Sequence, residues 1–177
     1  MNAIRRRAEI LSLIAKAQGP ITGAYLAEKF GVTRQVIVRD IALLRAAGHP
    51  IIATPQGYLQ PGTAETMLKI RRSFVVCHPP DPQAIETELN AIVDLGGHVL
   101  DVIVEHPVYG DLTGVLMINS RRDVQAFIDR LVSSKAEPLL VLREGVHLHT
   151  VEANHEAELD AIADELRRLG FLVEAEN

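Results

Sequence analysis

Hydrophobic positions over the first fifty residues recur at intervals of three and four, the spacing that gathers apolar side chains on one face of a helix. This pattern predicts helices over residues 3–17, 22–30 and 33–47. The second and third segments each begin with a threonine, which is a good N-cap, and Gly31 between them suits the positive backbone angle that ends a helix. Two short helices joined by a tight turn with glycine are typical of a helix-turn-helix.

Shorter apolar runs follow the third helix. Residues 51–54 and 58–59 read as two short strands, and the Pro-Gln-Gly segment at 55–57 favours a turn between them. We therefore expect a small two-stranded wing after the helices. Together these elements predict a winged helix-turn-helix DNA-binding domain over residues 1–60.

The third helix is the expected recognition helix. Ile37, Ile41 and Leu44 fall at i, i+4 and i+7 and should face the core. The residues expected to point outward near the beginning of the helix, where base edges are read, are Thr33, Arg34, Gln35, Val38 and Arg39. Arginine can bind guanine, glutamine adenine, and valine the methyl group of thymine. The alternative is a solvated face on an ordinary three-helix module.

The pattern from residue 71 onward alternates between strand and helix. The expected order is a strand at 71–77, a helix at 82–95, strands at 98–106 and 112–119, a helix at 121–134, strands at 138–143 and 146–152, and a helix at 155–169. This order predicts an α+β protein whose second part, residues 71–177, is an α/β regulatory domain with a mixed sheet covered by helices on one face. Residues 61–70 are the expected linker and include a short helical stretch.

The composition is that of folded domains. The chain has 177 residues, of which 47% are hydrophobic and 23% charged, and this argues against disorder. No apolar stretch reaches the roughly 18 residues that span a bilayer, so we expect no membrane partner. Cys77 is the single cysteine, which excludes an internal disulfide and suits a reducing, cytoplasmic location.

Charge is distributed unevenly between the two parts. Residues 1–60 carry eight Lys and Arg against three Asp and Glu, a formal charge of +5, whereas the remainder carries ten against twenty, a charge of −10. A basic segment beside an acidic one suggests that only the first part meets a polyanion such as DNA. Asymmetry by chance is the alternative in segments this short.

Three histidines of the second part have the spacing of metal ligands. His147 and His149 are two apart in a predicted strand and therefore point to the same face. His78 ends another predicted strand, and Glu86 lies one turn into the following helix, from which it can fold back toward the strand end. Three imidazoles and a carboxylate make a plausible ligand set for zinc, nickel, iron or cobalt. The alternative is that these are unrelated surface residues.

Parts of the sequence resemble known families. The run FGVTRQVIVRDI, residues 30–41, resembles the helix-turn-helix type 11 and DeoR-like regulators. The second part resembles the 3H domain, a small-molecule-binding module named for its histidines, in the runs CHP (77–79), EHPVYG (105–110) and GVHLHT (145–150). A type 11 helix-turn-helix followed by a 3H domain resembles the niacin-responsive transcriptional repressors of NAD synthesis and niacin uptake. This resemblance covers nearly the whole chain.

The resemblance implies a homodimer that binds palindromic operator half-sites, with one divalent transition metal per chain, nickel or zinc, and nicotinic acid as corepressor. The residues that it implies as metal ligands are His78, Glu86, His147 and His149. His106 matches the remaining histidine of the family. We expect His106, Tyr109 or Arg143 to hold the end of nicotinate that does not meet the metal, because arginine suits a carboxylate.

Two other interpretations stay open, although a regulator is favoured over an enzyme. A metal with bound water can hydrolyse a small amide such as nicotinamide, but no separate general base stands out in the sequence. Alternatively, the metal is structural or is itself the signal, in which case adding the metal alone changes operator affinity.

Overall fold

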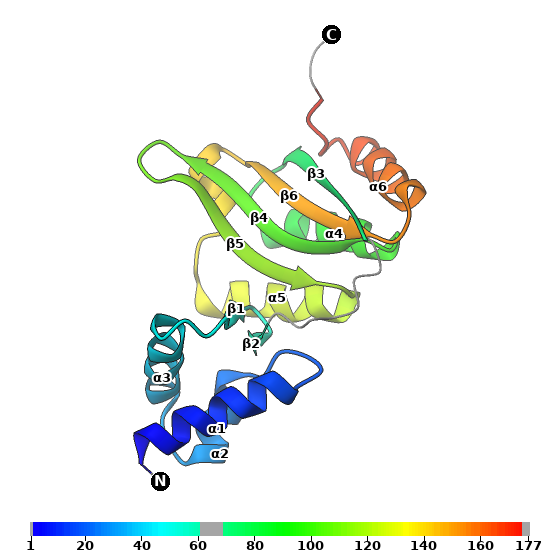
Figure 1. The fold of residues 1–177 in the computed structure, drawn as a ribbon. Coiled ribbons are helices and arrows are strands. Elements are labelled where there is room, and N and C mark those ends of the chain that lie inside the picture. Colours follow the sequence, from blue (N-terminus) through cyan, green and yellow to red (C-terminus); the bar gives the residue numbers. More distant parts are fainter. Residues whose placement is uncertain (1, 61–68, 175–177) are drawn as a thin grey trace. The chain divides into compact units, whose positions relative to one another are not determined.

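The computed structural model describes residues 2–60 and 69–174, which form two compact units, Met1–Glu65 and Thr66–Asn177 (Figure 1). The short helical stretch predicted within residues 61–70 lies outside the described residues, except that Ile70 already belongs to a strand. No described helix has the length and hydrophobicity that crossing a membrane requires.

The first unit contains three helices and a two-stranded ribbon, in the order predicted from the sequence. They are α1 (Ala3–Lys16), α2 (Gly23–Phe30), α3 (Arg34–Ala46), β1 (Ile52–Thr54) and β2 (Gly57–Leu59). Ile10, Leu26 and Ile37 come from the three helices and are fully buried against one another in a single core. This is the predicted winged helix-turn-helix.

Local residues explain where these helices begin and where the wing attaches. Thr22 and Thr33 cap α2 and α3, their hydroxyl groups accepting bonds from the backbone N–H of Tyr25 and Val36. The wing is fixed by Gly57, whose φ is +140° and whose backbone lies so close to the carbonyl of Ile21 that a Cβ would clash. The wing is therefore held directly onto the connection between α1 and α2.

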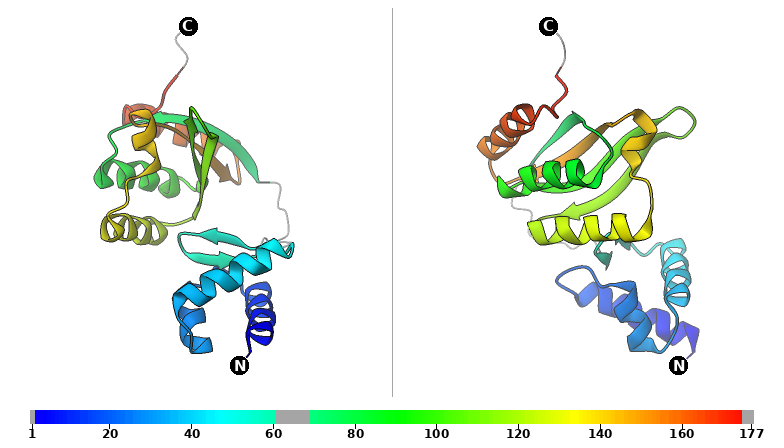
Figure 2. Two further views of the ribbon diagram at one scale, coloured as in Figure 1. Left: turned by 90° about the vertical axis from the view of Figure 1, so that its left-hand side faces the viewer. Right: turned by 180° about the vertical axis from the view of Figure 1, so that it is seen from behind.

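The second unit is a four-stranded sheet with helices on one face. Its elements are β3 (Ile70–Cys77), α4 (Pro82–Asp94), β4 (His98–His106), β5 (Gly110–Ile118), α5 (Arg121–Ser134), the 3₁₀ helix η1 (Leu139–Arg143), β6 (Val146–Ala153) and α6 (Glu156–Arg168). The strand order is β3-β6-β4-β5. Helices α4 and α5 lie side by side against the sheet, and α6 packs on β3, β6 and α4 (Figure 2). One hydrophobic core lies between these layers.

The α+β class and the helix-covered sheet are confirmed, with two differences in detail. Each pairing among the four strands is antiparallel, whereas a mixed sheet contains a parallel pair as well. The predicted strand at 138–143 is wrong, because this segment forms η1. Pro138 precedes the 3₁₀ turn, and Glu144 and Gly145 at positive φ end it, so the short apolar run turns instead of extending.

Candidate metal centre and recognition helix

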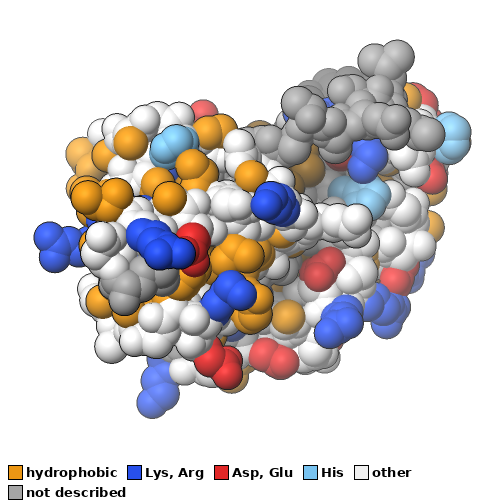
Figure 3. Space-filling view, turned by 60° about the horizontal axis from the view of Figure 1, so that its bottom comes forward, with side chains coloured by type: hydrophobic (Ala, Val, Ile, Leu, Met, Phe, Trp, Pro, Cys, Tyr) orange, Lys and Arg blue, Asp and Glu red, His pale blue; other side chains and the backbone are white. Residues whose placement is uncertain are grey.

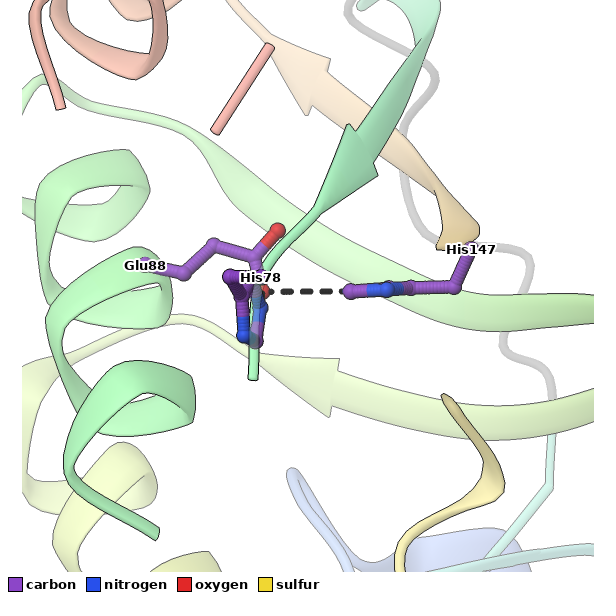
Figure 4. Close-up of side chains that lie close together, drawn as sticks. All are labelled: His78, Glu88 and His147. Atoms are coloured by element: carbon purple, nitrogen blue, oxygen red, sulfur yellow. Dashed lines mark hydrogen bonds and ion pairs between the residues drawn. The ribbon is translucent and has the colours of Figure 1, made fainter. Parts of the chain in front are cut away.

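Three imidazoles converge on one carboxylate in the second unit. The Oε2 atom of Glu88 lies 2.9 Å from His78 Nε2, 3.3 Å from His147 Nε2 and 3.4 Å from His149 Nε2. All four side chains are buried, and Glu88 is only 1% exposed. Figure 4 shows His78, Glu88 and His147 pointing toward one another, with a strand end, a helix and a second strand each contributing one residue.

Secondary structure brings these residues together from distant parts of the sequence. His78 directly follows β3, where Pro79 and Pro80 lead the chain out of the sheet. Alternation along β6 turns both His147 and His149 toward the core, since residues two apart share a face of a strand. Because β3 and β6 pair with His147 opposite Val76, the end of β3 lies beside the beginning of β6.

Each imidazole is oriented by its other ring nitrogen. The Nδ1 atoms of His78, His147 and His149 lie 2.8, 2.8 and 2.6 Å from the backbone carbonyl oxygens of Pro79, Gly145 and Asp101. A carbonyl can only accept, so each Nδ1 carries the proton. In a neutral imidazole the Nε2 lone pair then faces Glu88. A backbone carbonyl behind each ring is the usual support of a histidine that binds a metal.

Burial and mutual charge act together on the ionisation of this cluster. Burial alone favours the neutral form of Glu88, but the charge of His149 and the hydrogen bonds from the three histidines outweigh it and lower the pKa of Glu88 well below its ordinary value of 4.5. Burial also lowers the pKa of His78 and His149, yet Glu88 outweighs it and raises both above 6.5. The cluster therefore favours a negative carboxylate that is compensated by a positive charge.

One oxygen of the cluster has no bond. Glu88 Oε1 is buried without a hydrogen-bond partner among the described residues. A buried carboxylate oxygen without a hydrogen-bond partner is costly, and together with the three imidazole nitrogens this oxygen completes a set of ligand atoms that could hold a metal ion.

The carboxylate predicted from the sequence, Glu86, is not part of the cluster. Residues of a helix follow one another at about 100°, so Glu86 and Glu88 point to different sides of α4. Glu86 is half-buried, and its charge acts on Arg121. Glu88 instead falls within the buried stripe of Ile85, Leu89 and Ile92. That signal was in the sequence, since a carboxylate on the apolar face of a helix needs a partner.

Gly145 holds two of the histidines in place. Its φ is +96°, and its backbone lies against that of His78 so closely that a Cβ would clash with the His78 carbonyl oxygen. Its own carbonyl oxygen accepts the bond from His147 Nδ1. This close approach requires glycine, and the sequence alone gave no sign of it.

Of the residues predicted to hold nicotinate, His106 and Tyr109 lie at the tip of the β4–β5 hairpin, and Arg143 lies in η1. His106 Nδ1 accepts bonds from the backbone N–H groups of Val108 and Tyr109. Tyr109 is 74% exposed at the tip, and Arg143 in η1 forms an ion pair with Glu105 at 3.1 Å. Among the described residues of one chain, therefore, neither Tyr109 nor Arg143 bonds to the histidine cluster.

The recognition helix presents the residues expected to meet DNA. Thr33, Arg34, Gln35, Val38 and Arg39 are all exposed. The buried residues of α3 are Ile37, Asp40, Ile41 and Leu44, which lie on its other side. Figure 3 shows one face of the molecule, on which Lys and Arg side chains stand out among hydrophobic side chains and some Asp and Glu side chains.

A buried ion pair joins α3 to α1, and sequence reasoning missed it. Asp40 is 3% exposed, and its carboxylate accepts a bond from Arg6 Nε at 2.6 Å and a longer one from Arg7 Nη1 at 3.4 Å. Two of the arginines that make the first unit basic thus act inside the protein. The aspartate directly after Arg39 was the available signal.

Comparisons with known proteins agree with this architecture. Residues 71–175 match the 3H domain and residues 6–59 match an HTH domain. The chain is 43% identical over 169 residues to the "Probable transcription repressor NiaR" of Thermotoga maritima, which covers 96% of this chain and 94% of that protein. It is 42% identical over 168 residues to the "Transcription repressor NadR" of Bacillus subtilis, which covers 95% and 93%. A shorter match, 35% over 65 residues, is to "Transcriptional repressor CcpN" of Bacillus subtilis.

The fold and the matched domains define a DNA-binding transcription repressor that carries its helix-turn-helix ahead of a 3H domain. The chain belongs to the family of repressors that includes NiaR and NadR.

Proposed function

We propose that this repressor is niacin-responsive: that it controls genes of NAD biosynthesis and niacin uptake in the cytoplasm, as a homodimer, with nicotinic acid as corepressor and one nickel or zinc ion per chain. The observation that carries the proposal is the convergence of three Nε2 atoms on Glu88 in the unit that follows the DNA-binding unit. The near full-length match to NiaR and NadR supports it.

The donors fit a transition metal. Each Nδ1 donates a hydrogen bond to a backbone carbonyl, so the three Nε2 atoms face a carboxylate oxygen, and positive charge among them, from protons in the metal-free protein or from a metal ion, makes that arrangement favourable. Nitrogen donors from histidine with one carboxylate suit zinc or nickel. His78, Glu88, His147 and His149 would hold the ion. When bound, it supplies a Lewis-acidic position for the ring nitrogen or the carboxylate of a pyridine acid.

Three residues outside the cluster supply bonds for the other end of the ligand. His106 accepts two backbone bonds at Nδ1, so its Nε2 atom carries the proton and can donate to a carboxylate. Arg143 offers a bidentate guanidinium in addition to its bond with Glu105. Tyr109 contributes a phenol at the exposed hairpin tip. A flat anion such as nicotinate matches this combination of donors.

The DNA-binding step follows from the first unit. Residues at the beginning of α3 read base edges, and two copies read the halves of a palindrome whose centres lie about one helical turn, or a multiple of it, apart. Nicotinate acts as corepressor only if it binds the DNA-competent arrangement of the dimer more tightly than the other arrangement.

Operator binding with and without nicotinic acid tests the proposal. An operator is first selected from random duplex DNA with the metal-loaded protein and nicotinic acid, and its affinity is then measured by fluorescence anisotropy at one fixed salt concentration, because phosphate contacts make affinity depend steeply on salt. We expect tighter binding with nicotinic acid and little change with nicotinamide, which lacks the carboxylate.

The other outcomes separate the alternatives. Affinity that changes on metal addition but not with nicotinic acid would replace the corepressor with the metal itself as signal. Release of ammonia from nicotinamide by the metal-loaded protein, abolished in His147→Ala, would favour a hydrolase.

A further inference from the structure

The β4–β5 hairpin ends in an ordered apolar tip. Residues 105–111, here called the arm, include Val108 and Tyr109, which are 77% and 74% exposed. Contacts within the arm hold this tip in place: His106 accepts bonds from the backbone of both residues, its ring packs at a tilt against that of Tyr109 with centroids 4.9 Å apart, and His106 pairs with Gly110 across the hairpin. Large apolar side chains fixed in an exposed position are typical of a binding surface.

A hollow of complementary character opens close to the base of the arm. This space, here called the hollow, has a volume of about 410 Å³ and is lined by Leu142, Arg143, Glu144 and Val146. Leu142 and Val146, which are 48% and 40% exposed, give the hollow two apolar side chains, while Arg143 and Glu144 supply one charge of each sign. A tyrosine ring can pack against Leu142 and Val146 with its hydroxyl bound to either charge.

Arm and hollow are also matched in charge. Arg143 of the hollow already pairs with Glu105 at the base of its own arm. Asp111, at the other end of the arm, has no ion-pair partner within residues 2–60 and 69–174. A second arm that approaches the hollow would bring its Asp111 to Arg143, in the same kind of contact that the chain makes internally.

We propose that the arm binds a second copy of this chain, with Val108 and Tyr109 of each subunit entering the hollow of the other. A two-fold axis that passes between adjacent arms and hollows makes this contact twice, as in an isologous dimer. The inference rests on the proposed homodimer and names its surface. The exchange also brings Tyr109 of one subunit to Arg143 of the other, which places two residues expected to hold nicotinate together across the interface.

Oligomeric state gives the first test. The full chain, with metal and with or without nicotinic acid, is examined by sedimentation equilibrium beside the double variant Val108→Ser, Tyr109→Ser. We expect a dimer for the wild type and dimerisation weakened about 10-fold or more for the variant, because exposed aromatic anchors dominate interface energies. Val132→Ser, which removes a 57% exposed side chain from α5, is the matched control and should dimerise normally.

A cross-link distinguishes this surface from any other dimer contact. In a Cys77→Ser background, Tyr109→Cys protein and Val146→Cys protein are mixed and oxidised. Neither variant alone places an arm cysteine opposite a hollow cysteine, so a covalent dimer that forms only in the mixture supports the exchange. If the wild type is dimeric but gives no such cross-link, or if the double serine variant dimerises normally, the arm is not the dimer contact, although the homodimer itself still stands. A monomeric wild type would overturn the homodimer as well.

Discussion

Each imidazole of the histidine cluster is committed at both ring nitrogens. One nitrogen binds a backbone carbonyl, and the other faces Glu88. The rings therefore cannot turn without breaking a buried hydrogen bond, which fixes the direction in which each Nε2 atom points. The geometry of the cluster therefore depends on individual ring nitrogens, so single substitutions can test the role of each residue.

The identity of the carboxylate can be tested with a matched pair. Glu88→Gln should lose metal affinity by more than the roughly 10–100-fold that removal of an outer-shell partner costs, since Glu88 is itself a proposed ligand. Glu86→Gln, two residues away on the same helix, should bind metal as the wild type does. Competition titration with a chromophoric chelator measures both, and equal loss in the two variants would contradict the placement.

The pH dependence of stability should reverse on metal binding. The raised pKa of His78 and His149 means that their contribution in the metal-free protein is fully present below about pH 6.5 and is lost as pH rises through their folded values. The lowered pKa of Glu88 adds stability above about pH 4.5 that is lost as pH falls through its folded value.

Metal competes with protons for the same Nε2 atoms, so the metal-loaded protein should instead gain stability as pH rises from about 6 to 8. Urea unfolding with and without a chelator measures the two slopes. Parallel slopes would argue against a metal at this cluster.

At the scale of elements, two helices do most of the positioning. Helix α4 inserts a carboxylate into the core of the second unit, and α3 of the first unit exposes one side while a buried ion pair anchors the other. In both helices the buried stripe contains one acid, and that acid links the helix to distant parts of the chain. The orientation of α3 against the core therefore decides which of its side chains stay exposed and can contact DNA.

The ion pair between Asp40 and α1 should stabilise the first unit. Asp40→Asn leaves Arg6, whose side chain is only 12% exposed, without its charge partner. We expect a loss of about 1–3 kcal/mol in the free energy of unfolding, between the values for exposed and fully buried pairs. Chemical denaturation of the first unit measures it, with Glu9→Gln, which removes an exposed pair with Arg5, as the control that should change little.

Base reading belongs to the first turn of α3. Arg34→Ala should weaken operator binding by about 1–3 kcal/mol if Arg34 reads a base, and should relax specificity at one position. Arg45, which is exposed in the last turn of the same helix, gives the control variant Arg45→Ala, expected to keep the sequence preference. If both substitutions weaken binding equally on all DNA sequences, Arg34 contacts only the phosphate backbone and does not read a base.

At the scale of the whole molecule, the two units have separate cores. Only the second unit contains the histidine cluster, so metal should stabilise that unit alone. Chelation should lower the unfolding temperature of the second unit, by an amount that corresponds to about 4 kcal/mol when free metal was 1,000 times its dissociation constant. The transition of the first unit should stay unchanged in calorimetry, and a shift of both transitions together would show that the units unfold as one.

The sequence predicted most of this organisation because helical periodicity and N-caps are local signals. It predicted the three histidines of the cluster for the same reason, since strand alternation alone aligns His147 with His149. It missed what depends on distant backbone. The segment at 138–143 is too short and apolar to separate a strand from a 3₁₀ turn. Glu88 is a different case, because its place on the apolar stripe of α4 was present in the local sequence pattern, whereas the contact of Gly145 with His78 exists only after β3 and β6 have paired.

The double commitment of each imidazole also limits how this chain can change over evolutionary time. Replacing a histidine by alanine would remove a proposed metal ligand and, in the same step, leave a buried carbonyl oxygen unpaired, at a cost of about 1–3 kcal/mol. A substitution that removes metal binding would then also lower the amount of folded protein, and selection would act on both effects. Asparagine or glutamine, which keep an N–H donor for the carbonyl, offer the easier first step, so a lineage that abandoned the ligand would be expected to pass through an amide.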